Sequence, residues 1–240
     1  MGSERLYHLP GFYEPFSSFS HWLGAVVFLF LGWALLVRAR NNRGGFRYVA
    51  AFAVAVVLMM VISGLFHMPP RGSPLHRVAE RFDHAAIFVM IAGSFTPALG
   101  ILFSGRSRAR GLTIIWGAAL VGITIKTLFF DRVPEWLGLS MYLGMGWFGA
   151  VIVFVAARGH GLNFVKPLLL GGLAYSIGAV NEYFQYFNIV PGVIQAHELH
   201  HVTVLIGAFA HWVWVWQFAT WEPRADRASE GYEEPSPQTA

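Results

Sequence analysis

The 240-residue sequence contains no cysteine and little charge. Without cysteine the chain has no disulfide framework and no thiolate metal site, so any metal must be held by histidine and carboxylate side chains. Only 12% of the residues are Asp, Glu, Lys or Arg, whereas soluble domains contain roughly 25%. The composition therefore excludes an ordinary soluble domain and any fold built on disulfide bonds.

Lysine is also nearly absent, because the chain has two lysines and 15 arginines. The last long apolar run contains no lysine, which excludes a retinal-type protein with a Schiff base there. The net charge of +4 comes from arginines in the predicted loops, so there is no basic face and no nucleic-acid partner is expected. No internal repeat is evident, which argues against a transporter built from repeats. The preference for arginine favours a GC-rich bacterial source.

Long apolar runs are what the sequence has in place of charge. Each is about 20 residues long, enough to cross a hydrocarbon core of roughly 30 Å. Hydropathy places seven of them near 19–38, 48–67, 83–103, 112–130, 137–157, 164–187 and 196–219. They predict an all-α integral membrane protein, a seven-transmembrane helix bundle over 19–221. An N-terminal segment (1–18) precedes it, and a polar tail (222–240) that is expected to be disordered follows.

Five of the seven spans bring their unusual polar residues to one side of the membrane, the side that holds the N-terminus. Ionisable groups within a membrane are costly to bury and are functional candidates by default. Their convergence therefore predicts a buried polar site. The residues are Glu14, His21, Ser63, His67, Asp83, His84, Asn181, Glu182, His197, Glu198, His200 and His201.

Three of these histidines form a metal hypothesis. His197 and His201 are four residues apart and so share one face of a helix. With His67 from the second span they supply three imidazoles, the ligand set of a catalytic zinc site whose fourth position holds water. Asp83 would hydrogen-bond this water and take its proton, and Ser63, one turn before His67, would support it. We predict Zn2+ on the three histidines, with Asp83 and Ser63 as catalytic residues.

Simpler interpretations exist for several of these residues. Ser63 can hydrogen-bond its own helix backbone, and Asp83 can be a helix N-terminal residue stabilised by the macrodipole. His200 lies off the face shared by the ligands and is expected to support them or to pack. His211, deeper in the last span, is expected to be a satisfied interior histidine and not a ligand.

A protease interpretation of the last span is also open. The string His197-Glu198-x-x-His201 matches the HExxH pattern of metalloproteases, in which Glu198 would be the general base. A short pattern is weakly specific, however. After His201 no carboxylate occurs before Glu222, outside the span, to act as a third ligand.

Several segments of the chain resemble one family. They are Glu14 followed by His21-Trp22-Leu23-Gly24-Ala25, Ser63-Gly64-Leu65-Phe66-His67, Phe82-Asp83-His84 through Gly93-Ser94-Phe95-Thr96-Pro97, Tyr142 with Met145-Gly146-Trp147, and His197-x-x-x-His201 with Gly207 and His211. Together they resemble the hemolysin III / progestin and adipoQ receptor family, seven-span proteins related to alkaline ceramidases, over nearly the whole chain.

This resemblance implies roles for the same residues. In the family, the histidine of S-x-x-x-H and the two of H-x-x-x-H bind zinc, while the serine and the aspartate attend the zinc water. Animal members are receptors, ceramidase-like amide hydrolysis is associated with the group, and the bacterial "hemolysin" label implies pore formation. The chain departs at Ser17, where receptor members have Asn. It also lacks their long N-terminal region, so a signalling role is not implied.

Two functional hypotheses follow. The first is a zinc-dependent membrane hydrolase acting on a lipid amide (ceramide-like) or ester bond, with a membrane lipid as substrate. The second is a receptor- or channel/pore-like protein in which zinc only ties the last span to the second. Eleven of the 17 Lys and Arg residues lie on the side opposite the site. The positive-inside rule puts that side in the cytoplasm and the N-terminus outside, and we expect the bacterial cytoplasmic (inner) membrane.

Overall fold

The computed structural model describes residues 9–190 and 193–224, and within them the chain is helical with no β-strand. Seven helical segments are long and apolar enough to cross a membrane, which confirms the predicted fold. The predicted tail lies outside the described residues beyond Arg224, and so does the chain before residue 9. The elements are α1 (Pro15–Ala39), α2 (Phe46–Phe66), α3 (Pro74–Ile101), α4 (Gly105–Leu128), the 3-10 turn η1 (Phe130–Arg132), α5 (Glu135–Trp147), α6 (Gly149–His160), α7 (Leu162–Phe184) and α8 (Ala196–Phe218).

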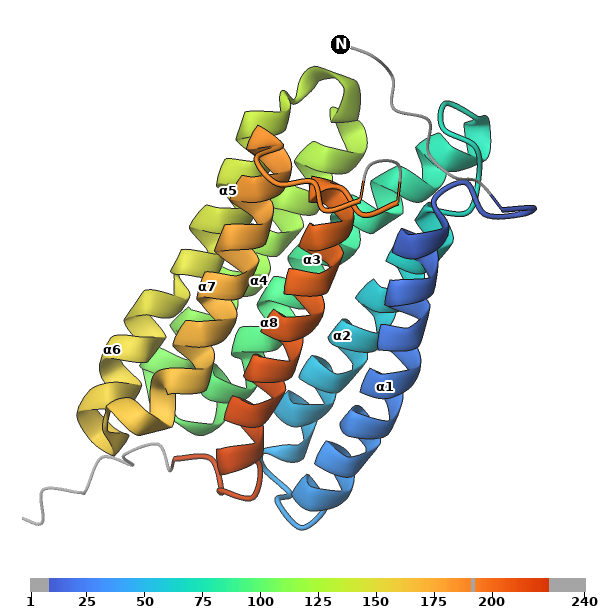
Figure 1. The fold of residues 1–240 in the computed structure, drawn as a ribbon. Helices are drawn as coiled ribbons and strands as arrows, with labels where there is room; N and C mark the ends of the chain where they lie inside the picture. Colours follow the sequence, from blue (N-terminus) through green and yellow to red (C-terminus); the bar gives the residue numbers. More distant parts are fainter. Residues whose placement is uncertain (1–8, 191–192, 225–240) are drawn as a thin grey trace, which may run out of the picture.

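Successive spans run antiparallel and pack side by side (Figure 1). α1, α2 and α3 pack in that order, α7 packs on α8, and α8 returns to contact both α1 and α3. α3 is the most enclosed span, and large side chains such as Phe88 on α3, Phe52 on α2 and Trp214 on α8 are fully buried. This arrangement brings α2, α3 and α8 together, which are the elements that carry the predicted metal site.

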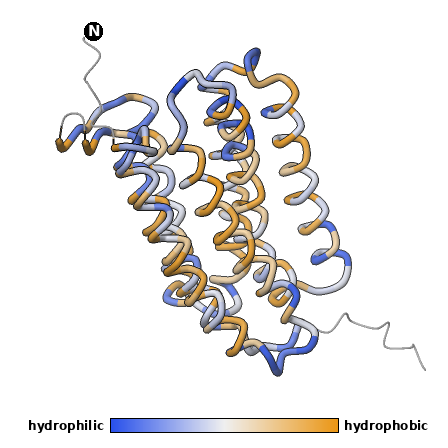
Figure 2. The backbone as a smooth tube through the Cα atoms, turned by 90° about the vertical axis from the view of Figure 1, so that its right-hand side faces the viewer, coloured by the Kyte–Doolittle hydropathy of each residue, from blue (hydrophilic) through white to orange (hydrophobic). Residues whose placement is uncertain are grey.

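The outer surface of the bundle is apolar. Leu23 and Phe30 on α1 are each 66% exposed, and Leu120 on α4 is 63% exposed. Figure 2 shows hydrophobic residues along the middle of the helices and hydrophilic ones gathered in the connections at the two ends. Apolar patches of this extent are unusual on a water-facing surface, whereas lipid chains are a suitable environment for them.

The third span begins earlier than hydropathy predicts. α3 starts at Pro74, where the Ser73 hydroxyl accepts a hydrogen bond from the His76 N–H at 3.1 Å and caps the helix. The apolar run begins only near residue 83, because the first turns of α3 are polar. Asp83 is therefore well inside a helix, so the interpretation of Asp83 as a helix N-terminal residue is wrong.

The fifth span, predicted as one helix over 137–157, is two helices that meet at Phe148. Gly144, Gly146 and Gly149 surround the break, and glycine is a weak helix former. The Phe148 N–H still donates to the Gly144 carbonyl at 3.2 Å. The two pieces therefore continue as one membrane-crossing segment, Glu135–His160.

At the end of the bundle opposite the polar residues, Asn42 joins the α1–α2 connection to the end of α8. Its side-chain amide donates to the Ala219 carbonyl at 3.0 Å and to the Trp221 carbonyl at 2.6 Å. Its side-chain oxygen accepts from the Gly45 N–H at 2.7 Å. Asn42 is only 2% exposed, and its bonds to Ala219 and Gly45 are buried, so those two backbone groups have little access to water as a substitute partner.

We predict that Asn42→Ala destabilises the bundle by about 2–4 kcal/mol, because it leaves two buried backbone groups and one part-buried backbone group without a partner. The neighbouring Asn41→Ala, at an exposed position, serves as the control and should melt like the wild type. The measurement is the melting temperature of each purified protein in the same detergent. Equal melting temperatures for the two variants would contradict the assigned role of Asn42.

Candidate metal centre

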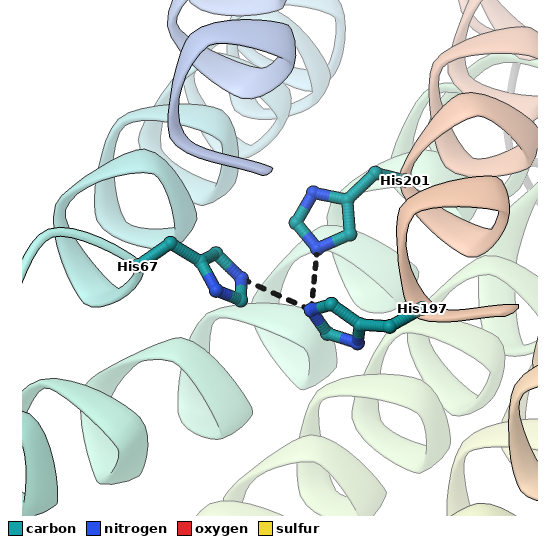
Figure 3. A group of neighbouring side chains, drawn as sticks. All are labelled: His67, His197 and His201. Atoms are coloured by element: carbon teal, nitrogen blue, oxygen red, sulfur yellow. Dashed lines mark hydrogen bonds between the residues drawn. The ribbon is translucent and has the colours of Figure 1, made fainter. Parts of the chain in front are cut away.

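The rings of His67, His197 and His201 face one another at one end of the bundle (Figure 3). His67 directly follows α2, and the other two lie in the first turns of α8. The Nε2 atom of His197 is 3.4 Å from that of His67 and 3.1 Å from that of His201. One ligand atom from each residue lies within 4.8 Å of the others, so the group could hold a metal ion. The structure thus brings together the three histidines that the sequence analysis selected as ligands.

This group has the character of a ligand set more than of a packed aromatic cluster. His67 and His201 are buried, with 2% and 5% of their surface exposed. A neutral imidazole has one nitrogen that donates and one that accepts a hydrogen bond. Three neutral rings that turn accepting nitrogens toward one point repel one another unless a proton or a cation lies between them. A metal ion would satisfy all three.

Carboxylates hold the far nitrogens of two of these rings. The Nδ1 atom of His197 lies 2.6 Å from a Glu182 oxygen, and the other Glu182 oxygen is bonded to Nδ1 of His200. Nδ1 of His67 is bonded to Glu14, which also pairs with Arg71. A carboxylate that accepts the Nδ1 proton fixes the tautomer and leaves Nε2 free to bind a metal. Both contacts therefore orient the rings toward the centre of the group.

Glu14 is placed by backbone hydrogen bonds that tie the start of α1 to the end of α2. Its N–H donates to the His67 carbonyl at 3.1 Å, and the Tyr13 N–H donates to the Met68 carbonyl at 3.0 Å. Burial alone would raise the pKa of the Glu14 carboxyl. The hydrogen bond to His67 and the charge of Arg71 outweigh that effect and lower the pKa from 4.5 to about 2. Glu14 is thus an ionised acceptor for His67.

Asp83 and Ser63, the two residues predicted to be catalytic, lie at the same end of the bundle as this group. Asp83 is buried in α3, with the Ser63 side chain within hydrogen-bonding reach of its carboxylate. Asp83 is also close enough to His197 and Glu182 for their charges to act on it. Its Oδ1 atom has no hydrogen-bond partner in the part of the chain that the structure describes. A buried carboxylate oxygen without a donor is costly, so a donor from outside these residues is expected there.

Glu198, the general base in the protease interpretation, makes hydrogen bonds that do not involve the three histidines. Its Oε2 atom accepts from the Gln195 N–H at 3.0 Å and completes a capping box at the start of α8. Its Oε1 atom accepts from the Ser17 hydroxyl at 3.2 Å. Both oxygens are therefore occupied away from the three histidines, which disfavours a general-base role. Ser17, where the chain departs from the receptor members, connects α1 to this cap.

Three further histidines, His21, His200 and His211, lie outside the group of three. His21 on α1 packs against His201 with ring centroids 3.9 Å apart and the rings tilted by 31°, a contact that no short motif indicates. His200 shares Glu182 with His197, which agrees with a supporting position. His211 lies in the interior and outside the metal group, as expected. It is not the satisfied histidine that was expected, because neither ring nitrogen has a hydrogen-bond partner among the described residues.

The carboxylate contacts generate a prediction that separates Glu182 from Glu198. Glu182→Gln should weaken metal binding about 10- to 100-fold, because it removes the acceptor that orients His197. Glu198→Gln should leave the metal affinity unchanged and lower only the melting temperature, because it weakens the cap of α8. Affinities can be measured by competition with a chelator of known affinity. In a HExxH protease site, by contrast, Glu198 would be the general base. Glu198→Gln would then damage catalysis more than Glu182→Gln does.

Comparison with known proteins identifies the family of the chain. The model of a family described as haemolysin-III related matches residues 12–212. The "Hemolysin-3 homolog" of Bacillus subtilis (strain 168) is 30% identical over 82% of this chain and 90% of its own length. "Hemolysin-3" of Bacillus cereus is 31% identical over 81% and 86%. "Progestin and adipoQ receptor-like protein 1" of Caenorhabditis elegans is 27% identical over 88% of this chain and 55% of its own length. The chain therefore belongs to the haemolysin III / progestin and adipoQ receptor family of membrane proteins.

Proposed function

We propose that this protein is a zinc-dependent hydrolase that cleaves an amide bond of a ceramide-like membrane lipid, or a lipid ester bond. The observation that carries the proposal is the group of three histidines together with Asp83, which is close enough to His197 for its charge to act on it and whose buried Oδ1 atom has no partner among the described residues. Three histidines without cysteine are typical of zinc sites that keep one position open for catalysis. A structural site would more often use four protein ligands.

Each residue of the site would have its own role in the reaction. When bound, zinc would act as a Lewis acid and lower the pKa of a water molecule. Asp83 would accept a proton of this water as the water oxygen bonds to the carbonyl carbon of the lipid, and would deliver that proton to the amine or alcohol that departs as its bond to this carbon breaks. Ser63 would hold the other carboxylate oxygen of Asp83 in place. Glu14 and Glu182 would keep His67 and His197 in their binding orientation.

The depth of the group in the membrane supports a lipid substrate. α2 ends at Phe66 and α8 begins at Ala196, so the group lies at the level of the helix ends and not at the middle of the bundle. The amide or ester of a membrane lipid joins its headgroup to its acyl chains and therefore lies at a similar level. A lipid would present the scissile bond at the site without leaving its leaflet.

We predict that Asp83→Asn keeps about one zinc ion per chain and loses at least about 100-fold in turnover, the usual scale of general acid–base catalysis. His67→Ala should lose both zinc and turnover. Glu135→Gln, which changes an exposed carboxylate at the same end of the bundle, should keep both. The measurements are metal analysis and hydrolysis of a fluorescent short-chain ceramide or ester by the purified protein. Unchanged turnover in Asp83→Asn would contradict the mechanism.

The second candidate is a receptor- or pore-like protein with a structural metal ion. It is favoured by the fact that the three histidines join the end of α2 to the start of α8, so that one ion would tie these helices together. In that case the wild-type protein would hold zinc but turn over no lipid amide or ester. His67→Ala would then chiefly lower the melting temperature.

We also propose that the histidine end of the bundle lies outside the bacterial cytoplasmic membrane. The two ends differ in charge, since most Lys and Arg residues flank the opposite ends of the helices. We predict that green fluorescent protein fused after Ala240 fluoresces in the cytoplasm and that alkaline phosphatase fused there is inactive. Active phosphatase together with dark fluorescent protein would overturn this orientation.

A further inference from the structure

The end of the bundle opposite the histidines carries positive charge that the described residues do not neutralise. Of the eight acidic side chains in the described residues, only Glu222 lies at this end. The α1–α2 connection and its flanks alone contribute four arginines, at positions 38, 40, 43 and 47. None of these four forms an ion pair with any residue that the structure describes. Their charges are therefore available to an anionic partner.

A groove between α1 and α8 concentrates part of this charge. It has a volume of about 490 Å3 and lies where the ends of the two helices pack side by side (Figure 1). Trp33, Val37, Arg38 and Arg40 line it from α1 and its end, and Trp216 lines it from α8. Aromatic and basic side chains thus meet in one concave surface.

The guanidinium of Arg38 is fixed in this groove before any ligand arrives. Its Nε atom donates to the Trp216 carbonyl at 3.0 Å, and its central carbon lies 4.6 Å from the centre of the Trp216 ring. The two terminal nitrogens remain unused by the described residues. A guanidinium held in this way can donate two parallel hydrogen bonds to a phosphate. Arg40, exposed at the end of α1, adds a second positive charge.

The position of the groove selects a lipid as the source of the phosphate. Trp33 is 66% exposed and lies six residues, or about 9 Å, before the end of α1, the level at which tryptophan occupies the membrane interface. The exposed apolar face of α1, including Phe30 at 66% exposed, leads away from it toward the membrane centre. Acyl chains would follow this face while the headgroup meets the arginines.

We propose that this groove, defined by Trp33, Arg38, Arg40 and Trp216, binds the phosphate of an anionic phospholipid. The site is separate from the histidine group, because it lies at the other end of α1 and α8. It does not depend on the proposed hydrolase function.

The test uses the full-length protein in neutral detergent with phosphatidylglycerol or phosphatidylcholine of the same acyl chains. Native mass spectrometry and melting temperature report binding. Phosphatidylglycerol should bind and raise the melting temperature, whereas phosphatidylcholine and inorganic phosphate should have little effect. Arg38→Gln with Arg40→Gln should weaken phosphatidylglycerol binding by about tenfold or more. Arg106→Gln with Arg110→Gln, which removes equal charge from exposed positions on α4 at the same end, should bind like the wild type.

A second variant keeps the test independent of the anchoring contacts of Arg38. Trp33→Ala with Arg40→Gln changes only exposed side chains and should also weaken binding while the zinc content and the lipid-free melting temperature stay at wild-type values. Equal losses in the α4 control pair would show diffuse attraction to the basic end and overturn the site. Unchanged binding in both groove variants, or a response to inorganic phosphate as large as that to the lipid, would also overturn it.

Discussion

The cost of placing ionisable groups in hydrocarbon governs this structure. At the histidine end, several of these groups are met by a partner from another segment of the bundle. Glu14 meets His67, and Glu182 meets His197 and His200. These pairs join α1 to α2 and α7 to α8, so the same contacts that make polar burial tolerable also set the relative positions of the helices. A metal ion among the histidines would extend this network across the bundle.

The fold follows from hydropathy because lipid demands long apolar segments whose backbone groups are satisfied internally. The helix ends are harder to predict, since hydropathy marks the limit of the apolar run and not of the helix. α3 extends nine residues before its apolar run because Ser73 caps it and Pro74 suits its first position. Hydropathy also does not predict the break at Phe148, because it follows the apolar run and not the helix. The glycines beside it are apolar enough to continue the run but do not favour a helix.

The histidine group could be predicted because the spacing of residues along a helix and the side of the membrane on which they lie both follow directly from the sequence. His197 and His201 share a helix face, and counting the spans puts His67 at the same end. Which carboxylate meets which histidine depends on the rotation of α7 against α8, and no spacing encodes that. The role of Glu198 was ambiguous for a related reason. A residue in the first turn of a helix can face the site or cap its own backbone, and here the capping box decides.

α1 and α8 take part in both ends of the molecule, although α1 is among the least enclosed spans. At the histidine end, Ser17 on α1 donates to Glu198 on α8. Near the other end, the Trp212 indole donates to the Leu31 carbonyl at 2.9 Å, and Arg38 donates to the Trp216 carbonyl. Polar contacts at both ends thus hold α1 in register where apolar packing alone would let it slide, because lipid competes equally well for an apolar helix face. A rotation of α1 that disturbed the groove between α1 and α8 would therefore also move Glu14 away from His67.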